Sequence, residues 1–253
     1  MERRNLLEAV IFDVWGTMLY PRVGLKEYYM ARAAAIADAL KKLGLNVSVD
    51  DVLRAFWEAR KTANAMRKHT LCEVPLKAEV VLLLKELGLD YSDEEIVDSV
   101  AAVYMRPYIE LLQAAPHLTE LLSFLLRAGV KLGVVSNSLD HSSLSTVLRK
   151  HGLSGFFDVV IASDRMCMIK PRWELFILAS SALCSIPANT VFVGDEEADI
   201  RGAKLVGMWT VAYEGFHPYT GVAPHFKVKD FLELREIIET MFRPTERSPG
   251  KRL

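Results

Sequence analysis

The chain has no uninterrupted apolar run of the roughly 18 residues that a membrane-spanning helix needs. Its N-terminal segment is charged, and its short apolar run is interrupted by Glu8, so we expect neither an export signal nor a membrane anchor. Cysteine is scarce and widely spaced, with Cys72, Cys167 and Cys184 as the three examples. We therefore expect no disulfide framework, no cysteine-rich zinc site and a reducing cytoplasm as the compartment.

The sequence also lacks an excess of either charge, because 31 basic side chains face 32 acidic ones. Proteins that bind nucleic acid or an anionic membrane surface usually carry a basic field. We therefore expect no nucleic-acid or membrane partner and favour a small solute as ligand. At 253 residues and 51% hydrophobic composition, the chain can bury a core of its own, as a monomer or a homodimer.

Five short apolar runs are typical of strands buried on both faces of a parallel sheet, because most of them lack polar alternation. They cover residues 9–13, 130–136, 157–162, 190–195 and 209–213. Between the last four lie stretches of helical length, at about 139–150, 173–183 and 197–205. This alternation predicts an α/β fold with a doubly wound, Rossmann-like parallel sheet.

The segment between the first two predicted strands differs, because it contains helical patterns and no convincing strand. Gly44 and Gly88 follow cationic last turns, where a left-handed residue can end a helix, and residues 92–95 have the spacing of a capping box. The predicted helices cover residues 25–43, 50–68, 76–87 and 93–113. We predict an α/β core at 1–20 and 114–242, an inserted all-helical cap at 21–113 and a disordered tail at 243–253.

Reactive side chains follow four of the predicted strands. They are Asp13, the pair Ser136 and Asn137, Lys170, and the acidic cluster at 194–199. Each has an ordinary structural explanation when taken alone, as a turn former, a helix cap or a solvated charge. Because ligands of parallel α/β sheets bind beyond the carboxyl ends of the strands, the joint occurrence favours one converging site.

Together with the helical insertion, these motifs make the chain resemble the haloacid dehalogenase superfamily of hydrolases over nearly its whole length. The matching stretches are DVWGT at 13–17, SN at 136–137, KP at 170–171 and GDEEAD at 194–199. The resemblance implies that Asp13 is the nucleophile of a covalent aspartyl intermediate. It also implies a catalytic Lys170, a transferred group held by Thr17, Ser136, Asn137 and Lys170, and Mg²⁺ held by Asp13, the Trp15 backbone carbonyl, Asp195 and, directly or through water, Asp199.

The physical chemistry of the acidic residues supports a metal independently. A phosphoryl group brings negative charge to a carboxylate nucleophile, so attack needs cations such as Mg²⁺, which prefers oxygen ligands, and the ammonium of Lys170. Without a cation, Asp13, Asp195 and Asp199 would repel one another, and one of them would take up a proton. The acidic cluster therefore favours Mg²⁺ as cofactor.

Trp15 departs from the phosphatases of this family, most of which carry a second aspartate at this position to protonate the leaving oxygen and then activate water. An indole donates one hydrogen bond and has no accessible acid–base chemistry. The resemblance thus predicts Mg²⁺-dependent hydrolysis of a small phosphorylated metabolite with a good leaving group, such as an acyl or aryl phosphate. Glu196 or Glu197 is a candidate surrogate acid or base.

Three alternatives stay open. In 2-haloacid dehalogenases an aromatic residue is common at this position, because a halide leaves without protonation, but these enzymes work without metal and lack acids like Asp195 and Asp199. Phosphonoacetaldehyde hydrolases lack the second acid and keep Mg²⁺, but they use a cap lysine as a Schiff base, for which Lys26, Lys61 and Lys68 are available. A catalytically weak phosphate-binding or regulatory protein is the third alternative.

The resemblance assigns substrate choice to the cap. The proline-containing segments 19–21 and 114–116 are predicted hinge strands. Arg60 or Arg67 is a candidate ligand for an anionic substrate, although a solvated helical face is the favoured interpretation of most of the basic segment 60–69. Four cap aromatics are interpreted as cap core, namely Tyr28, Tyr29, Phe56 and Trp57. No role is assigned to the histidines that lack metal-binding spacing, which are His117, His141 and His217.

Overall fold

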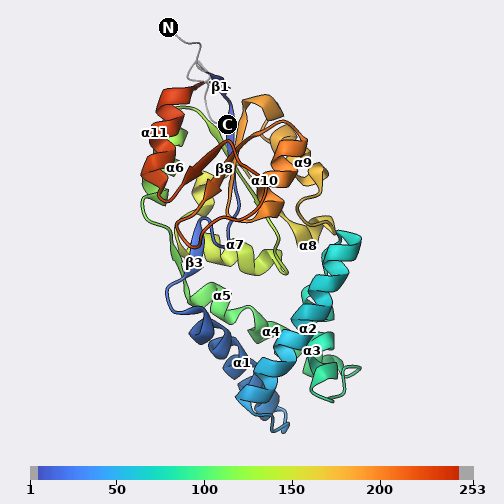
Figure 1. Ribbon diagram of the computed structural model, residues 1–253. Coiled ribbons are helices and arrows are strands. Elements are labelled where there is room, and N and C mark those ends of the chain that lie inside the picture. The colour runs from blue at the N-terminus through green and yellow to red at the C-terminus, as the bar shows by residue number, and fades with distance from the viewer. Residues whose placement is uncertain (1–4, 245–253) are drawn as a thin grey trace.

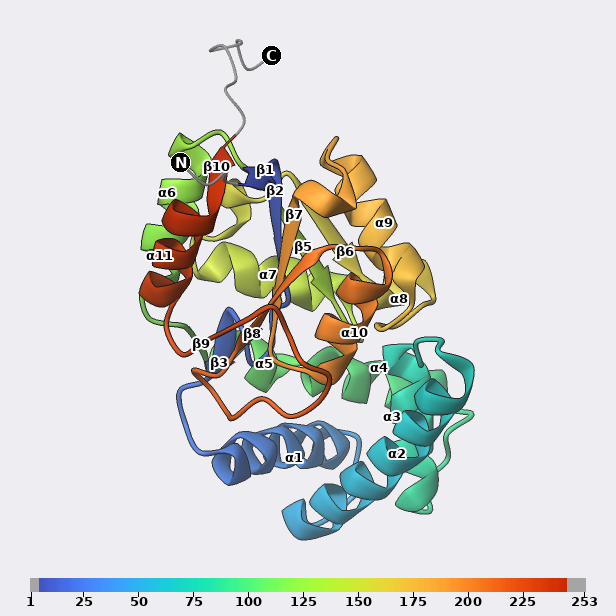
Figure 2. The same cartoon turned by 45° about the horizontal axis from the view of Figure 1, so that its top comes forward.

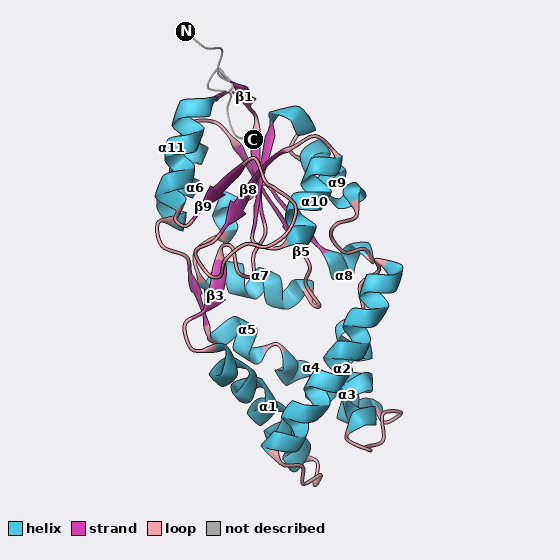
Figure 3. Cartoon of the chain, viewed as in Figure 1, coloured by secondary structure: helices cyan, strands magenta, loops and turns pink. Residues whose placement is uncertain are grey.

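A computed structural model of the protein describes residues 5–244 and contains an α/β core joined to a unit of helices (Figures 1 and 3). The tail was predicted to be disordered from residue 243, but residues 243 and 244 belong to a strand, so the start of that prediction is wrong. The rest of the predicted tail, 245–253, lies outside the described residues, as do residues 1–4.

A six-stranded sheet forms the core, with all strands parallel and the order β6-β5-β2-β7-β8-β9. Its strands are β2 (Ala9–Phe12), β5 (Lys131–Ser136), β6 (Val159–Ala162), β7 (Thr190–Gly194), β8 (Trp209–Tyr213) and β9 (Phe226–Val228). The first five confirm the predicted apolar runs. The edge strand β9 was missed, because it is short and includes the exposed Lys227.

Helices cover both faces of this sheet, which confirms the doubly wound α/β class. Figure 2 shows α6 and α11 on one side of the sheet and α9 and α10 on the other. Alternate residues of β2 divide accordingly, because Val10 and Phe12 belong to one hydrophobic cluster and Ala9 and Ile11 to the other. These helices are α6 (Leu118–Arg127), α7 (His141–Lys150), α9 (Trp173–Ala182), α10 (Glu197–Leu205) and α11 (Phe231–Met241).

Short elements complete the core. The strands β1 (Asn5–Leu7) and β10 (Phe242–Pro244) pair in parallel, and the antiparallel pair β3 (Leu19–Pro21) and β4 (Leu112–Ala114) carries the chain out of the core and back. β3 coincides with the first predicted hinge strand, 19–21, whereas β4 overlaps the second, predicted at 114–116, only at Ala114. The remaining short elements are α8 (Ser163–Met166), η1 (Ser154–Phe156) and η2 (Pro187–Asn189).

Five helices lie between β3 and β4, beyond one end of the sheet in Figure 1, and residues 25–110 are called the helical unit below. Gly44 and Gly88 have the predicted positive φ angles, 81° and 68°. The helices are α1 (Leu25–Lys42), α2 (Val49–Thr70), α3 (Leu76–Glu86), α4 (Glu94–Tyr104) and α5 (Arg106–Glu110).

Two predictions about the last helix of this unit are wrong. A single helix over 93–113 was expected, but the chain breaks at Met105, because Pro107 has no N–H to continue the helical hydrogen bonds, and β4 begins at Leu112. The capping box at 92–95 is also absent. Asp93 is the N-cap, and its side chain accepts hydrogen bonds from the N–H groups of Glu95 and Ile96.

Two further observations concern membrane spans and cysteine pairing. None of the helices in residues 5–244 combines the length and the apolar character of a membrane span. Cys72, Cys167 and Cys184 are unpaired and exposed.

Candidate active site

Asp13 directly follows the central strand β2, and its backbone N–H donates to the carbonyl of Val193 at 2.9 Å. The residue is 5% exposed. The ammonium of Lys170, which is equally buried, contacts Asp13 Oδ1 and lies 2.6 Å from Asp199 Oδ1. The predicted nucleophile and the predicted catalytic lysine therefore form one buried ion-paired group.

Two further carboxylates complete this group. Oxygen atoms of Asp13, Asp195 and Asp199 all lie within 4.8 Å of one another. Thr17 holds Asp195, because its hydroxyl donates to Asp195 Oδ1 at 2.8 Å. Asp199 Oδ2 accepts the backbone N–H of Glu196 at 3.0 Å, so the start of α10 orients the third carboxylate.

Two glycines allow the carboxylates to approach the backbone this closely. Gly16 has a φ of +81°, and a Cβ atom there would lie 2.2 Å from Asp195 Oδ2. A Cβ atom at Gly194 would lie 2.4 Å from Asp199 Cγ. Any side chain at either position would push a carboxylate out of the cluster, so the DVWGT and GDEEAD motifs need glycine for packing reasons.

Burial and neighbouring charges shift the pKa values of the clustered side chains. Burial raises the pKa of Asp195 to about 9, with further contributions from Asp13 and Asp199. Burial also raises the pKa of Asp13 to about 7, although Lys170 opposes the shift. Burial disfavours the charged form of Lys170 as well, but Asp13 and Asp199 outweigh it and raise the pKa of the ammonium.

The donor set fits a hard divalent cation. Three ionised carboxylates and one ammonium would leave two uncompensated negative charges in a buried site. Burial is the main cause of the raised pKa of Asp195, and the neighbouring charges of Asp13 and Asp199 raise it further. Because all the clustered ligands are oxygens, the chemistry of the site suits Mg²⁺ better than a metal that prefers thiolate or imidazole ligands.

The cluster opens into a cavity of about 540 Å³ between the core and the helical unit. Asn137 also lines this cavity, and its side-chain oxygen accepts the backbone N–H of Lys170 at 2.8 Å. Thr17 is fully buried and contacts Asp195, so a role for it toward substrate stays a prediction. The lining residues contributed by the core include Asp13, Ser136, Asn137, Lys170 and Glu196.

Trp15 lines this cavity. Its ring centroid lies 5.1 Å from that of Tyr28 and 6.2 Å from that of Tyr108, with which it is stacked at 18°. The indole therefore forms part of an aromatic wall in the cavity that Asp13 also lines. The placement of its backbone carbonyl as a metal ligand stays a prediction.

Most of the basic segment 60–69 is exposed, as predicted, whereas the two candidate substrate ligands, Arg60 and Arg67, line the cavity. Arg60 Nη1 lies 2.9 Å from Glu79 Oε1, and Arg67 Nη2 lies 2.8 Å from Glu79 Oε2. Glu79 is fully buried, yet the two guanidinium groups hold the pKa of its carboxyl below the usual value against the effect of burial. Among the three candidate Schiff-base lysines, Lys68 lines the cavity.

The interpretation of the cap aromatics as core is correct for Phe56 and incomplete for the others. Tyr28, Tyr29 and Trp57 line the cavity, and Trp57 is 45% exposed. Tyr28 is 1% exposed, so it belongs to the packed interior and to the cavity wall at once. A helical spacing of aromatics shows which side chains share a face but does not show whether that face meets solvent, core or substrate.

His217 received no role from the sequence, but the structure places its Nε2 atom 2.8 Å from Asp195 Oδ2. It lies in the loop after β8, at the same edge of the sheet as the acidic cluster. The sequence feature that could have identified His217 as a site residue is its position shortly after a predicted strand. Metal-type spacing to other histidines was the wrong criterion, because its partner is a carboxylate distant in sequence.

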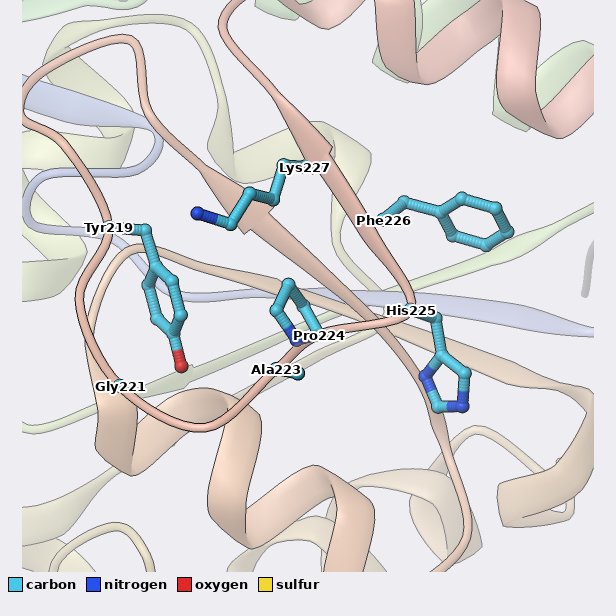
Figure 4. A pocket seen from close by; sticks show the side chains of 7 residues that line it. All are labelled: Tyr219, Gly221, Ala223, Pro224, His225, Phe226 and Lys227. Atoms are coloured by element: carbon cyan, nitrogen blue, oxygen red, sulfur yellow. The ribbon is translucent and has the colours of Figure 1, made fainter.

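A second hollow, of about 410 Å³, lies beside the edge strand β9 and is lined by residues of 219–227. Figure 4 shows the side chains of Tyr219 and Lys227 pointing toward one another across it, with Phe226 pointing away. Its lining contains none of the predicted site residues. The cavity that contains Asp13 is therefore the candidate active site.

These features define an α/β protein with a buried aspartate, a paired ammonium and two further clustered carboxylates at the carboxyl end of a parallel sheet. The chain belongs to the haloacid dehalogenase-like hydrolases, a family that matches residues 7–207.

Relatives within this family carry the names of phosphatases. The chain is 29% identical to a glyceraldehyde 3-phosphate phosphatase of Methanopyrus kandleri, over 93% of this chain and 99% of that protein. It is 28% identical to a phosphoglycolate phosphatase of Salmonella choleraesuis, over 82% and 81%.

Solved structures of two kinds share the fold. A phosphatase of this family from Thermococcus onnurineus matches with a TM-score of 0.67 and 25% identity, over 94% of this chain and all of that one. A 2-haloacid dehalogenase of Pseudomonas syringae matches with a TM-score of 0.69 and 20% identity, over 92% and 98%. Likeness of fold therefore does not separate the two reactions.

Proposed function

We propose that the protein is a Mg²⁺-dependent phosphatase that hydrolyses a small phosphorylated metabolite through a covalent intermediate on Asp13. The buried cluster of Asp13, Asp195 and Asp199 carries this proposal, because its excess negative charge suits a divalent cation. The phosphatase names of the relatives support the same reaction.

In the first step the Asp13 carboxylate attacks phosphorus, forming an O–P bond while the bond from phosphorus to the leaving oxygen breaks. Lys170 compensates charge beside the nucleophile, and Ser136, which lines the cavity, is placed to donate a hydrogen bond to the phosphoryl oxygens. Mg²⁺ held by Asp13, the Trp15 carbonyl, Asp195 and Asp199 would neutralise the charge that develops on the transferred group. Water then hydrolyses the aspartyl phosphate and returns the free carboxylate.

Trp15 limits the leaving group. It cannot protonate the departing oxygen, so the leaving anion must carry its own charge in the transition state. Acyl and aryl phosphates leave as stabilised anions and are therefore better substrates than alkyl phosphates. Glu196 lines the cavity and stays a candidate surrogate acid or base, whereas Glu197 pairs with Arg201 on the surface of α10.

The helical unit acts in this proposal as a cap, within the predicted boundaries 21–113. It contacts the core away from the β3–β4 pair, because the Ile169 N–H donates to the Leu71 carbonyl at 3.1 Å and the Ser163 hydroxyl donates to Glu73. These contacts close the cavity over the nucleophile. Exclusion of bulk water would strengthen the attraction between Lys170 and the transferred group.

One observation favours a second candidate function. Trp15 presents an aromatic surface beside Asp13, as suits a leaving group that needs no protonation, and this would serve dehalogenation of a 2-haloacid. The two reactions differ in their need for metal, so a cation dependence separates them. A cytoplasmic location and a monomeric or homodimeric state stay predictions.

The test is to incubate the purified protein with a panel of acyl, aryl and alkyl phosphates and 2-haloacids, with Mg²⁺ or with a chelator. Phosphate release that requires Mg²⁺ and disappears in Asp13→Asn is expected, while the matched variant Asp38→Asn, at an exposed position of α1, keeps full activity. Halide release that is indifferent to the chelator would establish the dehalogenase instead. Retained phosphate binding with no turnover would favour a regulatory protein.

A further inference from the structure

Arg32 is a buried cation that has no carboxylate partner in the described part of the chain. It lies on α1, is 5% exposed and lines the cavity that contains Asp13. In residues 5–244 its guanidinium donates one side-chain hydrogen bond, from Nη2 to the Tyr28 hydroxyl at 2.9 Å, and its buried Nε has no hydrogen-bond partner. An arginine offers five N–H donors and keeps its charge at physiological pH, so most of its binding capacity is unused.

Aromatic rings surround this guanidinium. Its central carbon lies 5.3 Å from the ring centroid of Tyr28, 5.8 Å from Tyr29, 5.3 Å from Phe56 and 5.1 Å from Tyr104. Such rings attract a cation through their electron-rich faces, but this attraction is weaker than the cost of removing a full charge from water. The aromatic shell therefore positions the guanidinium without neutralising it.

The neighbouring arginines of the cavity wall are already neutralised. Arg60 and Arg67 share the carboxylate of Glu79, and Arg67 also lies 2.6 Å from Glu73. Lys68 lines the cavity but is exposed, so water screens its charge. The helical unit therefore contributes Arg32 to the cavity wall as a buried cation. Its counter-charge must come from a ligand.

We propose that Arg32 binds a carboxylate carried by the leaving group, so that the substrate is a phosphorylated carboxylic acid. This inference rests on the proposed phosphatase function. Tyr28 touches Trp15 on one side and Arg32 on the other, so the body of the substrate lies along this aromatic pair between Asp13 and Arg32. One unpaired guanidinium balances the single negative charge of a carboxylate, whereas a second phosphate dianion would bring two charges, and the planar fork can bind both carboxylate oxygens.

Binding measurements test the proposal without turnover. The probes are ω-phosphonocarboxylates of increasing chain length, their neutral amides and bisphosphonates of the same lengths, titrated calorimetrically in the presence of Mg²⁺. At the best length we expect the carboxylate to bind ~10- to 100-fold more tightly than its amide, as for a charge-assisted hydrogen-bonded pair. Arg32→Gln should abolish this preference, Arg32→Lys should restore part of it, and Lys41→Gln, exposed on the same helix, should leave it unchanged.

Several results would overturn the proposal. A carboxylate preference that survives in Arg32→Gln, or equal binding of acid and amide at every length, would contradict it. Tighter binding of a bisphosphonate through Arg32 would contradict the assignment of a carboxylate. Circular dichroism of each variant separates loss of the fold from loss of the contact, and Arg32→Lys keeps the test valid if Arg32→Gln is unfolded.

Turnover distinguishes this inference from the proposed function. Mg²⁺-dependent hydrolysis of an aryl phosphate, with no gain in kcat/KM from a carboxylate on the leaving group, would refute the role of Arg32 alone. Carboxylate-dependent binding through Arg32 with no phosphate release from any phosphate ester would instead refute the phosphatase.

Discussion

The metal-free protein should lose stability as the pH rises, and Asp195 should be the main cause. Its folded-state pKa, about 9, lies far above the ordinary value of 3.8, because the buried side chain adjoins Asp13 and Asp199. Between these values the folded state binds a proton that the unfolded state has released, so unfolding becomes easier as pH increases. One such proton corresponds to ~1.4 kcal/mol of unfolding free energy per pH unit.

Asp195→Asn removes this titration while keeping the shape of the side chain. In a chelator, urea unfolding of both proteins from pH 5 to pH 8 should show the wild type losing about 4 kcal/mol relative to the variant, from the slope of one proton over three pH units. Saturating Mg²⁺ should stabilise the wild type at pH 8 and not Asp195→Asn. Parallel pH profiles in the chelator would show that Asp195 is ionised without metal, and the charge-excess argument for the cation site would fail.

Three further substitutions test other parts of the structure. Glu79→Gln removes a fully buried carboxylate that two guanidinium groups share, so urea unfolding should show a loss of roughly 3–5 kcal/mol. A loss below about 1 kcal/mol would mean that the pairs contribute little. Gly16→Ala places a methyl group against Asp195. Phosphatase activity should fall about 100-fold or more, while circular dichroism shows that the fold is retained. Near-normal activity would show that the carboxylates move freely. Trp15→Asp supplies the missing acid, so the ratio of kcat for alkyl phosphates to kcat for aryl phosphates should rise by up to ~100-fold. An unchanged ratio would mean that another group already protonates the leaving oxygen.

The sheet and the position of Asp13 at the end of its central strand could be predicted from sequence because both depend on local pattern. Unalternated apolar runs identified β2, β5, β6, β7 and β8, since strands buried on both faces have no solvent-facing positions. Asp13, Lys170 and the acidic cluster could then be placed together, because the carboxyl ends of parallel strands share one edge. The prediction of one helix over 93–113 was wrong because Pro107 interrupts the helical hydrogen bonds even though the apolar periodicity continues.

The cavity wall could not be predicted in the same way, because its character depends on contacts between distant segments. The contact of Arg60 with Glu79 joins two helices, so the sequence pattern of one helix does not show it. Arg32 and His217 carry no distinguishing sequence spacing, and their importance follows from what surrounds them in space. Burial without a charge partner is a property of the packed structure, so periodicity cannot show it.

The central claim, a covalent intermediate on Asp13, is tested most directly by trapping it. The wild type is mixed with an acyl or aryl phosphate and Mg²⁺, quenched in acid within the first turnover and mapped by mass spectrometry after proteolysis. We predict one phosphoryl group on the peptide containing Asp13, absent when Mg²⁺ is chelated and absent in Asp13→Asn. Steady phosphate release with no acyl phosphate on Asp13, or with the label on another residue, would contradict the account.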